Sequence, residues 1–319
     1  MRSFLVLMSL CISFAAFGQQ RDQYREVDLS QLGHATLFAI NERGVIAAAN
    51  DQGSFLYDSR SGQVLFHFPT GDTVTALSDN GNAAGHSTTG SAWFERDGVI
   101  QAIPLSQALG VNNDGMVAGF AGGFFVQAGV YSTADGSSTT ISLGGTQGAA
   151  FAINSSGQVA GQTTLQGGST SHAFLWSDGV VQDLGTLGGD SSTAFAIDNG
   201  GRVTGKAALS FEEAHAFLFN SSGMHDLGTL PGCTRSEGSA LHGRLIVGDS
   251  DSCSFAGSHA FISDGVRMTD LNDVAQSPDG FVYATARGIN GSGSIIGIAT
   301  APDGGSTRPF LLVRSNDGQ

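Results

Sequence analysis

Basic side chains are scarce in this chain of 319 residues, which has 14 Lys and Arg against 28 Asp and Glu and a single lysine, Lys206. The formal net charge is −14, and no basic stripe is present that could follow a phosphate backbone, which argues against nucleic-acid binding. Charged residues make up 13% of the chain, about half of the average share, so charged heptads are lacking and a coiled coil is excluded.

Proline is also rare, with 6 residues, whereas glycine is abundant, with 47. Hydrophobic residues account for 40% of the chain, which is enough for a large core, so we do not expect wholesale disorder. Low charge, little proline and abundant glycine together predict an all-β protein of short strands joined by tight turns.

Apolar runs of membrane length are absent, and the one marked run lies at the N-terminus. Residues 1–18 read MRSFLVLMSLCISFAAFG, with one arginine before the apolar run and small residues before a cleavage site after Gly18. The pattern predicts a secretory signal peptide, which leaves a mature domain over 19–319. A retained anchor and lipidation at Cys11 are the alternatives. The run is shorter than the roughly 20 residues that span a membrane, so we expect no span after cleavage and a periplasmic or extracellular location.

Only three cysteines are present, and Cys11 lies in the predicted signal peptide. An even count in an exported chain favours one disulfide, Cys233–Cys253, over two free thiols.

A repeat runs through most of the chain. Its pattern is x-small-apolar-[Asn/Ser/Asp]-x-x-Gly-x-x-small-small, and a shortened version lies at 239–248. The six full segments are 38–48, 75–85, 109–119, 151–161, 195–205 and 287–297. Their equivalent last positions, with that of the shortened segment, are 34 to 49 residues apart. A period of about 40–50 residues with strand-forming sequences indicates propeller blades rather than a helical solenoid.

Each unit divides into four strands, most clearly at 150–154, 158–163, 172–176 and 180–185. The last unit lacks a fourth strand, but EVDLSQLG at 26–33 matches VQDLGTLG at 181–188. The N-terminal strand is therefore expected to complete the last blade and to close the ring. We predict a β-propeller of seven four-stranded blades, with six or eight blades as alternatives because the first three units diverge.

The segments HAFLW (172–176), HAFLF (215–219) and HAFIS (259–263), with AFAIN…VAG and DLGTLGG or DLGTLPG, resemble the bacterial extracellular HAF repeats. The match is strong over about 144–271 and weaker, but in register, elsewhere. The resemblance implies a secreted or surface-associated bacterial protein, and it implies no catalytic residues.

Several side chains recur at fixed places in the repeat. His172, His215 and His259 are expected to make a repeated structural hydrogen bond, because equivalent positions in neighbouring blades do not converge on one metal ion. Recurring aromatic residues are expected in the core rather than on a sugar-stacking surface; they are Tyr57, Tyr131, Trp176 and Phe219 at one place and Phe55, Trp93, Phe174, Phe217 and Phe261 at another. Small residues are expected where the innermost strands crowd the axis, at Ala39, Ala76, Gly110, Ala152, Ala196 and Gly288.

Acidic residues provide the candidate ligand-binding side chains. Asp249 and Asp251 are placed in a loop after a second strand, and Asp190 and Glu237 in loops after fourth strands. Both loop types emerge on one face of a propeller, where Cys233 and Cys253 also lie. The candidates are Asp190, Glu212, Glu213, Asp249 and Asp251. Polar turns explain these residues without an ion, and calcium is the cofactor that such oxygen ligands would take otherwise.

No sequence motif identifies an enzyme: G-x-S-x-G, H-E-x-x-H and a P-loop are all absent. We therefore predict no catalytic residues and a secreted binding module that takes an unidentified macromolecule, protein or glycan. The loops 162–171, 206–214 and 249–258 are the expected binding surface. The alternatives are a polysaccharide-active hydrolase or lyase, in which two blades supply a carboxylate pair, and a structural cell-surface or matrix protein.

Overall fold

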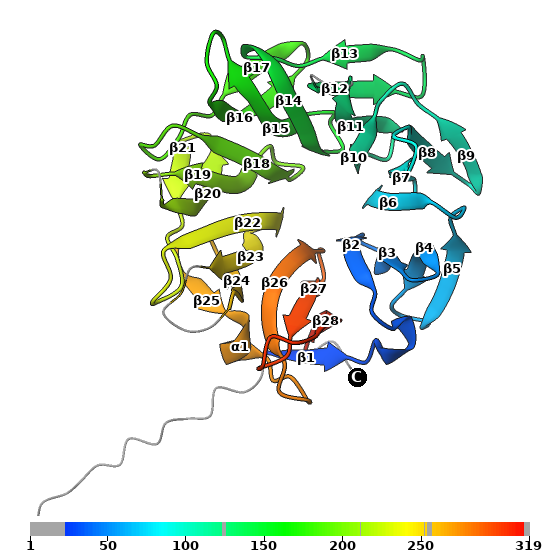
Figure 1. Cartoon of the computed structure of the whole chain (residues 1–319), viewed down its shortest axis with the longest axis vertical. Helices are drawn as coiled ribbons and strands as arrows, with labels where there is room; N and C mark the ends of the chain where they lie inside the picture. The colour runs from blue at the N-terminus through cyan, green and yellow to red at the C-terminus, as the bar shows by residue number, and fades with distance from the viewer. Residues whose placement is uncertain (1–22, 123–125, 211, 252, 254–256, 316–319) are drawn as a thin grey trace, which may run out of the picture.

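The repeated segments fold as blades around one axis (Figure 1). The computed structural model describes residues 23–122, 126–210, 212–251, 253 and 257–315, so the predicted signal peptide at 1–18 lies outside the described residues. Within them, seven four-stranded antiparallel sheets form a β-propeller. The predicted fold class and blade number are confirmed, and rings of six or eight blades are ruled out.

The strands alternate in direction from the channel outward in every blade. Blade by blade, they are β2 (Thr36–Ile40), β3 (Val45–Asn50), β4 (Gly53–Asp58) and β5 (Gln63–His67); β6 (Asp72–Leu77), β7 (Ala83–Ser87), β8 (Ala92–Arg96) and β9 (Val99–Ala102); β10 (Gln107–Val111), β11 (Met116–Ala121), β12 (Gln127–Ser132) and β13 (Ser138–Thr140); β14 (Gly144–Ile153), β15 (Val159–Leu165), β16 (Ser171–Ser177) and β17 (Val180–Asp183); β18 (Ser192–Ile197), β19 (Val203–Ala208), β20 (Ala214–Asn220) and β21 (Gly223–Asp226); β22 (Arg235–His242), β23 (Leu245–Asp251), β24 (His259–Ser263) and β25 (Met268–Asp270); and β26 (Val282–Ile289), β27 (Ile295–Thr300), β28 (Thr307–Arg314) and β1 (Tyr24–Val27).

Among the described residues, two short helical segments lie in the connections, η1 (Ser30–Leu32) and α1 (Leu271–Val274). No helix in the described part of the chain is long and apolar enough to cross a membrane.

The N-terminal strand completes the last blade, as predicted. β1 pairs antiparallel with β28, with Tyr24 opposite Arg314 and Val27 opposite Leu311. The strand is shorter than the matched segment 26–33, because the chain turns into η1 after Val27. Figure 1 shows the two ends of the described chain side by side in this blade.

A partly buried ion network strengthens this closure. The Glu26 carboxylate on β1 accepts hydrogen bonds from the Arg308 guanidinium and, at 2.8 Å, from the Tyr283 hydroxyl. Arg308 also donates to Asp279 at 2.8 Å. The Glu26 side chain is only 7% exposed. Charged hydrogen bonds of this kind are stronger than neutral ones, so the network holds the closing strand to blade seven.

Apolar side chains are buried between neighbouring blades rather than in one central core. Between blades four and five, for example, Ala160 and Ala173 pack with Val203 and Phe217. The aromatic residues predicted to be core are buried at Phe55, Tyr57, Trp93, Phe174, Phe217 and Phe261, and partly buried against the same clusters at Tyr131, Trp176 and Phe219. This prediction is confirmed.

Asparagines at the turn between first and second strands join blades one, three, four and seven to the next blade. Asn154 Oδ1 accepts the backbone N–H groups of Ser156 and Gln158, and its Nδ2 donates to the Asp198 carbonyl oxygen of the next blade at 2.9 Å. Asn41, Asn112 and Asn290 make the same inter-blade bond. An aspartate satisfies the turn but cannot donate across the interface, and Asp198 pairs with Arg202 instead.

A one-residue bulge interrupts the first strand of every blade at the same place. In β18 the register shifts between Ala194 and Ala196. The repeat glycine on the second strand, Gly205, faces this region, where an added Cβ would lie 1.9 Å from the Thr193 carbonyl oxygen. The corresponding distance is 1.9–2.1 Å at Gly85, Gly119, Gly161, Gly205, Gly248 and Gly297. Close backbone approach therefore explains the glycine that ends the repeat.

We predict that Gly205→Ala lowers the free energy of unfolding by about 1–3 kcal/mol, because the strands must move apart to admit the methyl group. Blade one carries Ala48 at this place, so the variant should still fold. Chemical denaturation of both proteins measures the effect.

Gly168→Ala is the matched control, since its added Cβ would meet nothing closer than 3.7 Å. It should change the free energy of unfolding by at most about 0.5–1 kcal/mol, and in the stabilising direction. Equal destabilisation by both substitutions would contradict the explanation.

Candidate functional site

The bulged residues line the central channel, one from each blade. They are Phe38, Thr75, Leu109, Phe151, Phe195, Ser239 and Arg287. Together with Glu237 and Thr285 they surround a cavity of about 420 Å³. Ligand sites in proteins are commonly cavities of roughly 300–1,000 Å³, so the channel is large enough to admit a small group.

The channel wall is apolar at blades three to five and polar at blades six and seven, and blades one and two contribute Phe38 and Thr75. Leu109, Phe151 and Phe195 follow one another on blades three to five, and the two phenylalanine rings meet edge to face at 5.6 Å. Blades six and seven contribute Ser239, Thr285 and Arg287 instead. Phe151 and Phe195 are only partly buried, which leaves aromatic surface facing the channel.

Strand alternation alone did not reveal these channel residues. It placed the small residues Ala39, Ala152 and Gly288 nearest the axis, whereas the bulge places the preceding residue in the channel wall. The small residues are still required by crowding, since a Cβ on Gly110 would lie 3.1 Å from the Ala152 Cα of the next blade. The one available signal was the variability of the position before the small residue, which is Phe, Thr, Leu, Phe, Phe, Ser and Arg in turn.

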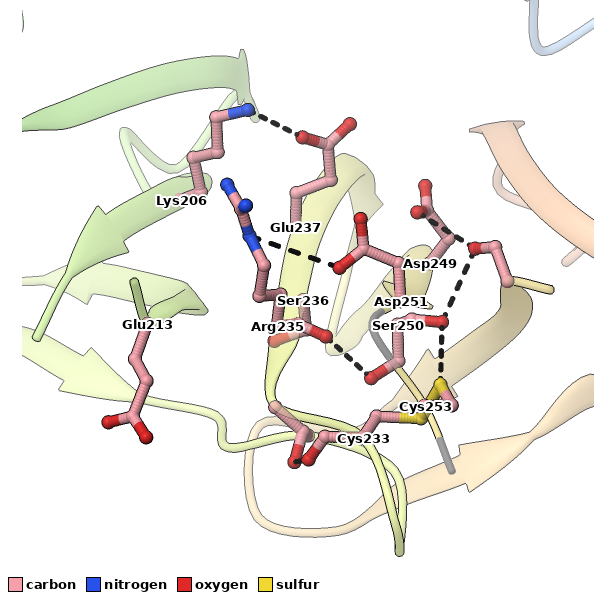
Figure 2. Close-up of polar contacts among 12 residues, drawn as sticks. Lys206, Glu213, Cys233, Arg235, Ser236, Glu237, Asp249, Ser250, Asp251 and Cys253 are labelled. Carbon is pink, nitrogen blue, oxygen red and sulfur yellow. Dashed lines mark hydrogen bonds and ion pairs between the residues drawn. A yellow bond between two sulfur atoms is a disulfide. The ribbon is translucent and has the colours of Figure 1, made fainter. Parts of the chain in front are cut away.

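An ion pair between blades five and six stands at the rim of this cavity. Lys206, directly after the repeat glycine on β19, places its Nζ 3.0 Å from Glu237 Oε2 on β22 (Figure 2). One blade earlier the equivalent Gln162 accepts the Thr193 hydroxyl at 2.6 Å. The equivalent contact is thus a neutral hydrogen bond at the interface between blades four and five, and an ion pair at the interface between blades five and six.

Asp249 lies directly opposite Glu237 in the register of β22 and β23. Its Oδ2 accepts the Ser258 hydroxyl at 3.2 Å. Burial raises the pKa of Asp249 to about 7, and the neighbouring Glu237 charge contributes in the same direction. Asp249 therefore titrates near neutral pH, because its carboxyl group is buried and faces a second carboxyl group across the ladder.

Asp251 lies two residues further along β23, at the end of the strand. Its Oδ1 is 4.0 Å from Arg235 Nε, as Figure 2 shows. Both side chains are about half exposed, so this contact contributes little to stability.

Three of the predicted placements need correction. Asp249 and Asp251 belong to strand β23, and Glu237 belongs to strand β22, rather than to loops. The ladder between these strands continues as far as the pair Arg235 and Asp251, which extends both strands into the expected loops.

The remaining candidates lie in connections, as predicted. Asp190, Glu212 and Glu213 line a cavity of about 140 Å³ with Lys206 and Arg235. In Figure 2, Glu213 stands apart from Glu237 and Asp249. The five acidic candidates therefore form two neighbouring groups around Arg235 rather than one site.

The predicted binding loops are shorter than expected. The second strands end at Leu165, Ala208 and Asp251, so strand occupies the beginning of each expected loop. Parts of the expected loops, at 211, 252 and 254–256, lie outside the described residues. We call the side of the disc that carries connections 166–170, 184–191, 209–213 and 227–234 the loop face, and the opposite side, with turns such as 154–158, the turn face.

The predicted disulfide is present. Cys233, in the connection before β22, is bonded to Cys253, just after β23. Nearby, the Ser250 hydroxyl donates to the Arg235 carbonyl oxygen at 2.8 Å. The bridge ties together the strand ends that carry Arg235 and Asp251 on the loop face (Figure 2).

The repeated histidines make the predicted structural bond. In each case the ring Nδ1 lies beside an aspartate on the neighbouring fourth strand; the pairs are His172–Asp183 (2.9 Å), His215–Asp226 (2.9 Å) and His259–Asp270 (2.5 Å). Each aspartate also accepts a backbone N–H two residues later, from Gly185, Gly228 and Asn272. Among the described residues, no three His, Cys, Asp or Glu side chains are grouped so that they could hold a metal ion.

The turn face holds a second cavity of about 420 Å³, lined by the turns that carry Asn112 and Asn154. The amide nitrogens of these asparagines donate to the next blade. Polar groups at this end of the channel therefore serve inter-blade contacts, which leaves the loop-face cavity as the better candidate site.

The raised pKa of Asp249 predicts a pH-dependent stability. An unfolded aspartate has a pKa near 3.8, so folding takes up a proton between about pH 4 and pH 7, and the free energy of unfolding falls as pH rises through this range. Asp249→Asn removes this penalty. It should match the parent near pH 4 and melt about 2 °C or more above it at pH 8, as differential scanning calorimetry would show. A variant that melts below the parent at pH 8 would contradict the assignment.

No family model and no curated protein matches the chain. Solved structures with a similar fold include the acylaminoacyl peptidase of Pyrococcus horikoshii, with a TM-score of 0.56 and 9% identity over 90% of this chain and 52% of that one. A prolyl endopeptidase has a TM-score of 0.57 and 10% identity over 88% of this chain and 50% of that one. This chain thus spans about half the length of the two peptidases.

Oligogalacturonate lyase from Vibrio parahaemolyticus is similar over 88% of this chain and 90% of its own, with a TM-score of 0.57 and 10% identity. The structural similarity shows a shared propeller fold, and at identities this low it does not assign an activity.

Proposed function

We propose that the protein is an exported, non-catalytic module that binds a glycan at the loop-face mouth of its central channel. One observation carries the proposal: the cavity wall combines partly buried phenylalanine rings with hydroxyl and charged groups. A sugar ring has the matching surface, since its C–H faces are apolar and its edges carry hydroxyl groups. Sites that bind small ligands commonly combine apolar walls with a few placed polar groups in this way.

The size of the cavity limits how such a ligand binds. A volume of about 420 Å³ admits only a few sugar units, so a glycan would enter by an end or a short branch. A protein partner would rest instead on the outer loops, where Asp190 and Glu213 lie. The channel therefore favours a glycan over a protein among the macromolecular ligands.

Export and family membership belong to the same proposal. The apolar N-terminal segment and the Cys233–Cys253 disulfide support an oxidising compartment outside the cytoplasm. The resemblance to HAF repeats is supported by a shared structural role, because the histidine of HAF and the aspartate of DLG meet in three blades.

Retention on immobilised glycans tests the proposal. The parent should be retained by at least one glycan of a panel, and Phe151→Ala should weaken retention about tenfold because it removes an apolar contact surface. Val180→Ala is the control, since Val180 is 70% exposed on outer strand β17. Retention unchanged by Phe151→Ala, in a variant that still melts cooperatively, would place the ligand elsewhere, and a parent retained by no glycan would overturn the proposal.

A second candidate is a glycan-cleaving enzyme whose carboxyl groups stand beside the channel, and Asp249 favours it. The pKa of Asp249, raised to about 7 by burial, suits a general acid or base, and Asp249 lies opposite the cavity-lining residue Glu237. The oligogalacturonate lyase of Vibrio parahaemolyticus is an enzyme with a similar propeller fold, which is an analogy of fold alone.

Product release separates the two candidates. We expect retention without shortened products when the parent is incubated with the panel and the supernatant is examined by chromatography. If products do appear, the enzyme candidate expects Asp249→Asn and Glu237→Gln to reduce their release at least about 100-fold, the usual contribution of a general acid or base. Asp190→Asn, in the neighbouring cavity, is the control and should leave release unchanged.

A further inference from the structure

Arg287 places an unpaired positive charge in the channel wall. It is exposed on the bulge of β26, and no acidic side chain of the described residues lies within 4 Å of its guanidinium group. Lys206, at the rim of the cavity, is paired with the cavity-lining Glu237 at 3.0 Å. Among the side chains that line the cavity, Arg287 is therefore the uncompensated charge, in a chain whose formal net charge is −14.

The bulge fixes where this charge is presented. Arg287 is held between Ala286 and Gly288, at the place where the other blades carry neutral residues. Added bulk at Gly288 would meet Ile296 on its own blade at 3.0 Å and Ile40 on the next at 3.3 Å. The backbone under Arg287 is thus packed on both sides, while its side chain faces solvent inside the channel.

The neighbours of Arg287 supply hydrogen-bonding groups. Thr285 lies two residues earlier on β26, and Ser239 occupies the bulge of the preceding blade. The aromatic residues Phe151 and Phe195 lie on other blades of the same cavity. A ligand that fills this space would meet a guanidinium and hydroxyl groups on one part of its surface and phenyl rings on another.

We propose that the channel binds an acidic sugar, a uronic acid unit whose carboxylate pairs with the Arg287 guanidinium while its ring packs against the phenylalanine side chains. This inference rests on the proposed glycan-binding function and specifies its ligand. A planar guanidinium can bind a carboxylate through two parallel hydrogen bonds. A neutral sugar has no carboxylate and cannot form this pair. The uronate also carries the hydroxyl groups that Ser239 and Thr285 can meet.

Methyl esterification provides a matched probe, because it removes the charge of the carboxylate and keeps the sugar ring. Calorimetric titration would compare trimers of galacturonate and of mannuronate with their methyl esters. At least one acidic trimer should bind the parent, and esterification should weaken binding about tenfold or more. Binding of the acid, unlike that of the ester, should weaken as salt is added.

Substitutions of Arg287 connect this preference to the residue. Arg287→Gln should remove the difference between acid and ester, whereas Arg287→Lys should keep part of it, because a lysine retains the charge without the paired geometry. Arg267→Gln is the control, since Arg267 is also exposed but lies between β24 and β25, away from the cavity. It should bind the acid as the parent does. Because Arg287 is exposed, all three variants should melt like the parent.

The outcomes separate this inference from the function on which it rests. If acid and ester bind equally, or if Arg287→Gln keeps the preference, the inference is overturned and glycan binding stands. The same holds if neutral glycans are retained and neither acidic trimer binds. If the parent retains no glycan of any kind, the proposed function fails together with the inference.

Discussion

The one-residue bulge in the first strand of every blade is the constraint on which both the packing and the channel depend. It brings the first-strand backbone so close to the second strand that the repeat ends in glycine in six blades, Gly205 among them. It also places the bulged residue in the channel wall. The bulge therefore requires small residues at two positions of the repeat, the glycine on the second strand and the residue that follows the bulged one. The bulged residue itself faces the channel and is free to vary.

That freedom is used unevenly around the ring. Blades three to five present Leu109, Phe151 and Phe195 to the channel, whereas blades six and seven present polar and charged groups. Blade six departs furthest from the repeat, with a shortened first turn and the disulfide Cys233–Cys253 at its loop-face end. The asparagine that donates to the next blade is also replaced here, by Asp198 in blade five, which pairs with Arg202, and by His242 in blade six. Because seven interfaces between blades hold the scaffold, one blade can differ from the repeat. The charged candidate residues lie in and around this blade.

Sequence periodicity was sufficient for the architecture because the features that define it are repeated or local. The glycine-ended segments marked the blades, EVDLSQLG marked the closing strand, and His172 with its counterparts marked a structural bond that the structure confirms. The channel was not predictable in the same way, because a bulge changes by one residue which side chain faces the channel, and its one signal in the sequence is that this position varies between blades. Phe151 and Arg287 were missed for that reason, and Ala152 and Gly288 were assigned to the axis in their place. Glu237 was assigned to a loop because β22 continues beyond the repeat, and the environment of Asp249 depends on Ser258 and Glu237, whose proximity only the folded chain shows.

In the proposed function, the ligand site is the loop-face mouth of the channel, with its phenyl rings and Arg287. A crystal structure of the protein with the best-retained oligosaccharide would locate the ligand. We expect electron density for the sugar inside the channel, in contact with Phe151 or Phe195 and with an anionic group at Arg287. Sugar density in the turn-face cavity beside Asn112 and Asn154, or along the outer strands, would contradict it.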